Sequence, residues 1–174
     1  MDGYMTELAA TRASLQETMT FLGAIASGIE EAIGESANGI SYLAGKRLGM
    51  KLSEKVEKTD DLLQALESVR RVLQENSCLW HFEPFQMHDR PEMIELTETG
   101  EEVNLVFRDC MIRQSLFRFG HQQKGSLCNM MFGFFAGALH NIMGRDSVLE
   151  IRHAGENACY KRLLIQKAGT KEVA

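Results

Sequence analysis

The chain has 174 residues, a length that suits one domain around a single core, and we expect residues 1–174 to form that domain. The net charge is −5, so charge gives no basis for binding nucleic acid. Proline is scarce and the apolar content is ordinary, which argues against a disordered chain.

The four cysteines are Cys78, Cys110, Cys128 and Cys159. In a mid-sized chain without a visible signal peptide, they indicate reduced thiols or metal ligands rather than a disulfide framework. The longest apolar run, residues 130–139, is too short to span a bilayer. We therefore expect a cytoplasmic protein with no transmembrane segment.

The N-terminal part predicts one long amphipathic helix over residues 4–33, which Gly34 would end. Its apolar residues recur every seven positions, with others beside them: Leu8, Leu15, Met19, Leu22, Ile25, Ile29 and Ile33. Such a stripe packs either into the core of its own chain or against a second copy. The first interpretation is favoured here, and the two are compatible.

Two further helices follow. The second runs from Ile40 to Val56 and carries Gly45 and Gly49, which are tolerated inside a helix where another backbone comes close. Thr59 or Asp60 would begin the third helix, which fades near Asn76. Its inward-facing residues would be Leu62, Leu63, Leu66, Val69, Val72 and Leu73.

The middle of the chain changes to the alternating pattern of strands. Residues 78–85, 93–97 and 102–108 predict an antiparallel meander, whereas residues 110–119 fit neither helix nor strand. Ser126 could then cap an almost wholly apolar helix over residues 127–143, which Gly144 ends.

Two strands, residues 147–153 and 158–166, complete the pattern. The sequence thus predicts an α+β fold in which the N-terminal helices (residues 4–76) and one buried C-terminal helix pack on an antiparallel sheet. The sheet would comprise the strands in residues 78–108 and a terminal hairpin. The buried helix and this hairpin would together occupy residues 126–166.

Four residues near the C-terminus are candidate metal ligands: Cys128, Glu150, His153 and Cys159. Cys128 lies in the first turn of the apolar helix, where the helix N-terminus favours a thiolate. The other three lie on or beside the last hairpin. Two thiolates, an imidazole and a carboxylate suit a closed, structural zinc site. The alternative is that the cysteines are buried apolar residues, that Glu150 pairs with Arg152 or Arg145, and that His153 is a turn histidine.

Three segments carry a resemblance to a known family: residues 127–137, 148–150 and 155–160, together with the glycine pair Gly45 and Gly49. They resemble the 4-vinyl-reductase domain family, also called hydrocarbon-binding domains. Family members show a cysteine that opens a glycine-containing helix, a glutamate in the next strand, and cysteines around the last hairpin. The resemblance extends from Asp109 to Ile165.

The resemblance implies a fold related to small subunits of the TRAPP vesicle-tethering complex, and often a dimer. Phenol-sensing bacterial regulators carry the same domain. In those sensors it implies zinc held by three cysteines and a glutamate, which become Cys128, Glu150, His153 and Cys159 here. His153 stands where a cysteine is usual, and the hairpin is shorter.

The resemblance also implies a pocket for a small apolar or tetrapyrrole ligand between the helix and the sheet. Its candidate lining residues are Trp80, Phe82, Phe107, Phe117, Phe119, Met130, Met131 and Phe134. A filled core is the alternative.

Three functions follow from these observations. The leading one is a non-catalytic, dimeric sensor or carrier of a small hydrophobic ligand. The second is an assembly or scaffold protein with a filled core. The third, an enzyme, has little support, since the chain has no dinucleotide fingerprint, phosphate loop or nucleophile elbow. Cys110, beside Asp109, has no assignable base.

Overall fold

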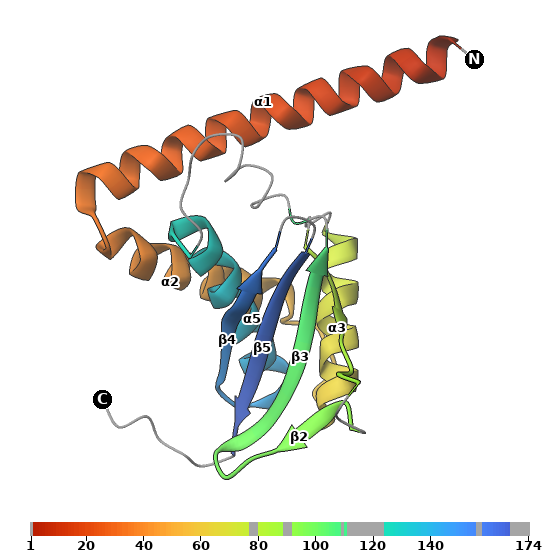
Figure 1. Ribbon diagram of the computed structural model, residues 1–174, viewed down its shortest axis with the longest axis vertical. Coiled ribbons are helices and arrows are strands. Elements are labelled where there is room, and N and C mark those ends of the chain that lie inside the picture. The colour runs from red at the N-terminus through yellow and green to blue at the C-terminus, as the bar shows by residue number, and fades with distance from the viewer. Residues whose placement is uncertain are drawn as a thin grey trace.

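The structure is a computed structural model that describes residues 2–76, 80–88, 92–108, 110, 124–155 and 158–167. Side chains are described for these residues except 2–13, 15, 16 and 19. Helices pack on one antiparallel sheet, which confirms the predicted α+β fold (Figure 1). Within these residues, no helix has the length and apolar character needed to cross a membrane.

The first helix, α1 (Asp2–Ile33), reaches well beyond the sheet and the other helices (Figure 1). It ends as predicted at Gly34, whose φ of 59° is a left-handed conformation that glycine adopts without strain. Gly23 and Ala26 are buried against the rest of the chain. The neighbouring apolar stripe is exposed: Leu22, Ile25, Ile29 and Ile33.

Core packing within one chain was therefore the wrong interpretation for these four stripe residues, each of which is more than 40% exposed. The other members of the stripe, Leu8, Leu15 and Met19, lie outside the described side chains. Helix α1 contacts the rest of the chain along a narrow strip of its surface, so the apolar residues beside that strip remain exposed to solvent.

The second helix, α2 (Ser36–Leu52), crosses α5 (Ser126–Met143) at very short range. The predicted glycines make this possible: Gly45 and Gly49 of α2 face Gly133 and Gly137 of α5. A Cβ atom built on any of the four would overlap the backbone of the other helix. α5 ends at Gly144, as predicted, but begins after Gly125 rather than with Ser126 as its cap.

The third helix is α3 (Leu62–Glu75), and its cap lies one residue after Asp60 and two after Thr59, the two predicted caps. Asp61 is its cap, and its carboxylate accepts a hydrogen bond of 2.9 Å from the Gln64 backbone N–H. The predicted inward residues are buried except Leu63, which is 41% exposed.

The sheet has the order β1-β3-β5-β4, and all its pairings are antiparallel. Its strands are β1 (His81–Pro84), β2 (Ile94–Leu96), β3 (Gly100–Arg108), β4 (Ser147–Ala154) and β5 (Ala158–Gln166). The predicted meander was wrong in one respect. β1 and β2 do not pair with each other, because each occupies a different stretch of the same edge of the long strand β3.

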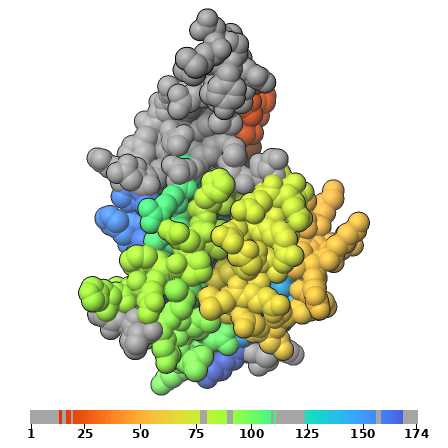
Figure 2. Space-filling view, turned by 90° about the vertical axis from the view of Figure 1, so that its right-hand side faces the viewer, coloured from red at the N-terminus to blue at the C-terminus, as the bar shows by residue number. Residues whose placement is uncertain are grey.

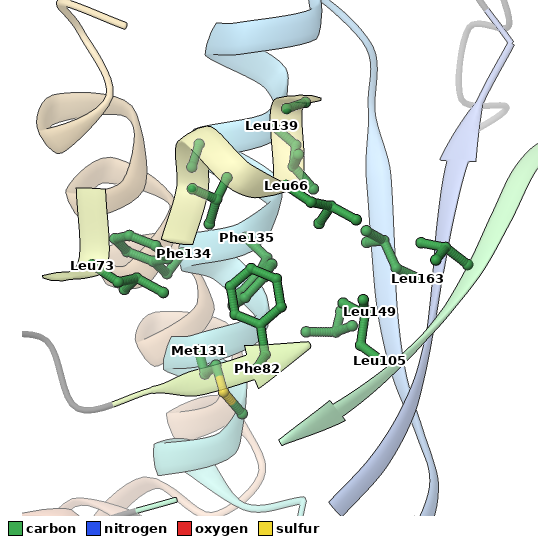
Figure 3. Close-up of a cluster of buried hydrophobic side chains, with 14 of the residues drawn as sticks. Leu66, Leu73, Phe82, Leu105, Met131, Phe134, Phe135, Leu139, Leu149 and Leu163 are labelled. Atoms are coloured by element: carbon green, nitrogen blue, oxygen red, sulfur yellow. The ribbon is translucent and has the colours of Figure 1, made fainter. Parts of the chain in front are cut away.

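The core lies between the sheet and the helices α3 and α5. Figure 3 shows Phe134, Phe135 and Leu139 of α5 pointing toward Leu66 and Leu73 of α3 and toward strand residues such as Leu105 and Leu163. Alternation along β5 sends every second side chain into this core: Cys159, Lys161, Leu163 and Ile165 are buried. The other side chains of β5 face the opposite side of the sheet.

Candidate ligand-binding core and a buried amine

A cluster of aromatic rings occupies the space between α5 and the sheet. Phe82 of β1 lies 5.5 Å from Phe107 of β3 and 5.1 Å from Phe135 of α5, measured between ring centroids. Phe134 continues the cluster toward Trp80, at 5.4 Å in an edge-to-face arrangement. Such pairs stabilise the core beyond the area they bury.

The predicted pocket residues belong largely to this cluster. Phe82, Phe107, Met131 and Phe134 are buried in one core, and Trp80 packs against it. Met130 is only partly buried, and its backbone lies against Gly45 of α2. Phe117 and Phe119 lie outside the described residues.

A buried amine was missed by the sequence analysis. Lys161 of β5 is 1% exposed, and it is the only buried lysine, arginine, aspartate or glutamate in the part of the chain that the structure describes. Its Nζ lies 4.2 Å from the ring centroid of Phe107 and 5.1 Å from that of Phe132. Its hydrogen-bond acceptor is the Sδ atom of Met131, at 3.5 Å. The alternation of residues 158–166 could have predicted this burial, since Lys161 lies on the same face of the strand as Cys159 and Leu163.

The surroundings of Lys161 are apolar and rich in sulfur. Burial lowers the pKa of Lys161 from its ordinary value of 10.5, and the nearby thiols Cys159, Cys128 and Cys110 oppose that shift. Burial also raises the pKa of Cys128, against opposing effects that include the charge of Lys161. All three cysteines are buried, and none of them forms a disulfide in the part of the chain that the structure describes. Both effects favour a neutral amine beside a neutral Cys128 thiol.

The four candidate metal ligands do not converge in this structure. Cys128 and Cys159 face the core, whereas Glu150 and His153 are exposed on the outer face of the sheet. Glu150 pairs across the strands with Arg162, which donates to it at 3.0 Å. No group of three or more His, Cys, Asp or Glu side chains suited to a metal occurs among the residues described.

Arg162 ties the outer face together instead. Its guanidinium also donates to Glu102 of β3, at 3.2 Å, so one arginine connects three strands. Glu150 lies on this face by regular alternation along β4, and His153 joins it because β4 is irregular between Ile151 and His153, which places His153 opposite Tyr160.

A surface groove of about 610 Å³ lies apart from the aromatic core, between the segment after α2 and the helix α3. Figure 2 shows this face, with α3 in yellow beside the orange end of α2. Both charge signs line the groove: Lys51, Lys55, Lys58 and Arg71 alternate with Glu54, Glu57 and Glu75. The mixture favours a solvated surface over a site for one sign of charge.

Comparison with known proteins gives a fold but no family. No family model matches the chain, and no curated protein matches it. Solved structures do share its fold. One is the phenol-responsive sensory domain of the transcription activator PoxR, solved with phenol, at a TM-score of 0.64 and 14% sequence identity. The match covers 84% of this chain and 74% of the sensory domain.

Proposed function

We propose that this protein is a non-catalytic sensor or carrier that binds a small hydrophobic ligand between α5 and the sheet. The observation that carries the proposal is the shared fold with a phenol-responsive sensory domain over most of the chain. The aromatic cluster supports it, because rings such as Phe82, Phe107 and Phe134 offer flat apolar surface to an aromatic guest.

The core also contains a side chain that a bound ligand can displace. Met131 is 1% exposed within the cluster, and its unbranched thioether adopts many shapes at little cost. A ligand can therefore displace a methionine side chain more cheaply than a phenylalanine ring. The same residue is the hydrogen-bond acceptor of Lys161.

Thermal unfolding with a ligand panel tests this function. A ligand that binds only the native state at 100 times its Kd stabilises it by about 2.7 kcal/mol. In a chain of this size, that shifts Tm by roughly 5–11 °C. The panel comprises phenol, toluene, naphthalene and a tetrapyrrole. A Tm that no compound in the panel moves would contradict the proposal.

We further propose that the protein acts as a homodimer through its exposed apolar residues. Exposed apolar residues occur on both α1 and α2: Phe21, Leu22, Ile25, Ile29 and Ile33, then Ile40, Leu43 and Met50. A second copy presents the same apolar residues, so a two-fold interface would cover both sets. Large exposed apolar patches are unusual in monomers.

The second candidate function is an assembly or scaffold protein. The tight aromatic packing of Phe82 against Phe107 and Phe135 favours it, since a filled core leaves the surface as the functional part. The ligand panel separates the two candidates, because a scaffold with a filled core gains no stability from any member of it.

Structural zinc remains a prediction from the family resemblance. The ligands would be Cys128, Glu150, His153 and Cys159, and zinc would supply a cross-link between α5 and the β4–β5 hairpin. The donor types fit zinc, but their placement on two faces of the sheet does not. Binding would require Glu150 to leave Arg162 and reach the inner face. The proposed function therefore does not depend on zinc.

A further inference from the structure

The amine of Lys161 has no anionic partner in the part of the chain that the structure describes. The ring faces of Phe107 and Phe132 and the sulfur of Met131 contact it, and no described carboxylate lies within 4 Å of it. Across the β4–β5 pair it stands opposite the apolar Ile151. An isolated ammonium in such surroundings is costly, and a single anion would remove most of that cost.

Among the residues that the structure describes, the titratable groups that act on this amine are thiols. Cys159 lies two residues away on β5, Cys128 is on α5, and Cys110 follows β3. Burial keeps the Cys128 thiol protonated at neutral pH. The amine is thus a donor inside the aromatic core, with acceptors that are weak or uncharged.

We propose that Lys161 binds the carboxylate of an apolar organic acid, an aromatic carboxylate in its simplest form. The proposal rests on the proposed ligand-binding function and specifies the chemistry of the ligand. The carboxylate would replace the thioether of Met131 as the acceptor of the Nζ protons. The aromatic body would lie among the rings that flank the amine, those of Phe107 and Phe132.

Neither a scaffold nor a binder of neutral hydrocarbons needs an amine buried among aromatic rings, whereas a binder of aromatic carboxylates does. A hydrocarbon gains nothing from an amine, whereas a carboxylate in a low-dielectric site gains a charge-assisted hydrogen bond. Because burial lowers the pKa of Lys161, binding of the carboxylate anion is expected to be accompanied by proton uptake by the amine.

Isothermal titration calorimetry on the full chain tests the proposal with two matched pairs of probes: benzoate against benzyl alcohol, and phenylacetate against 2-phenylethanol. Each carboxylate is expected to bind at least about tenfold more tightly than its alcohol. Lys161→Met should lose about tenfold or more in carboxylate affinity and leave the alcohols within about twofold. Lys55→Met, which changes an exposed lysine, is the control and should match the wild type.

A second measurement needs only the wild-type chain. Titrations in two buffers with different ionisation enthalpies report proton uptake, which is expected for benzoate and absent for benzyl alcohol. Binding of the alcohols without the carboxylates, or undiminished benzoate binding by Lys161→Met, would overturn the role of Lys161 and leave ligand binding intact. Failure of all four probes to bind would count against the proposed function itself, and the role of Lys161 would fall with it.

Discussion

The carbonyl oxygen of Phe134 lies against the α-carbon of Gly49, at a place where any Cβ atom on residue 49 would overlap it. Phe134 also contributes its ring to the aromatic core. The glycine contact on α2 therefore fixes the position of the helix that supplies the candidate ligand-binding rings.

Gly49→Ala is expected to destabilise the fold strongly, because the clashing atoms belong to a backbone and cannot rotate away. Overpacking of a core costs about 1–3 kcal/mol, and the backbone clash places this substitution at or beyond the upper end. Urea unfolding measures the loss.

Gly39→Ala is the matched control in the same helix. A Cβ atom at residue 39 would meet nothing within 4 Å. Because alanine favours a helix interior over glycine by about 1 kcal/mol, this variant should be as stable as the wild type or more so. Equal losses in both variants would show that the glycine crossing does not determine the stability.

Lys161→Met should stabilise the protein at neutral pH by up to roughly 1–3 kcal/mol, the cost of burying a polar group without compensation, because the Met131 thioether is a weak acceptor. The pKa of Lys161 is lowered in the folded state, so between that pKa and 10.5 the unfolded chain binds more protons. Stability contributed through Lys161 therefore rises with pH across this window.

The advantage of Lys161→Met is thus expected to shrink as the pH approaches 10.5, the ordinary pKa of lysine. Cys128 shifts in the opposite direction but is common to both proteins, so their difference isolates the lysine. Urea unfolding at a series of pH values checks this, and a constant difference would contradict a buried, neutral amine.

Glu30→Gln should loosen the contact between α1 and the body. The Glu30 carboxylate accepts a hydrogen bond of 2.7 Å from the backbone N–H of Ser126, the first residue of α5. An anion at a helix N-terminus stabilises it by about 0.3–1 kcal/mol. Hydrogen exchange of residues 20–33 is expected to accelerate, while exchange in the sheet stays unchanged. Glu31→Gln, an exposed neighbour, is the control.

Ile25→Glu combined with Ile29→Glu should convert the proposed dimer to monomers. Both side chains are exposed on α1, so the double substitution costs little in the monomer but places charges in a dimer interface. Light scattering after gel filtration measures the mass. Ser27→Glu adds a charge on the opposite side of the same helix and should leave the dimer intact. A wild-type protein that is monomeric in this measurement would contradict the dimer proposal.

Glu150→Gln separates the two roles considered for Glu150. As the partner of Arg162 on the exposed face, Glu150 contributes about 1 kcal/mol or less, and the variant should unfold almost like the wild type. As a zinc ligand, it would be needed to retain the metal. Elemental analysis of zinc in the wild type, in Glu150→Gln and, for comparison, in Cys159→Ser distinguishes the two roles. Stoichiometric zinc that both substitutions abolish would require a hairpin different from the one described.

Local patterns predicted most of the helices and strands, and the ends of α1 and α5 at Gly34 and Gly144, because local physics fixes them. Gly34 and Gly144 adopt left-handed conformations that end helices, and the alternation of residues 158–166 defines a strand. The glycine pair Gly45 and Gly49 also predicted close contact with another backbone, which α5 provides. Here the sequence and the structure agree because these features depend on residues that are close together in the chain.

Three features were decided only by the tertiary structure. Each strand presents two faces, and pairing with its neighbours determines which face meets α5; this put Cys159 inside and Glu150 outside. The exposure of Ile25 depends on how narrowly α1 touches the body. The environment of Lys161 depends on rings from β3 and α5, which are distant in the chain. Residue type and spacing determine which elements form, whereas burial and partnership arise from contacts between elements and so require the assembled fold.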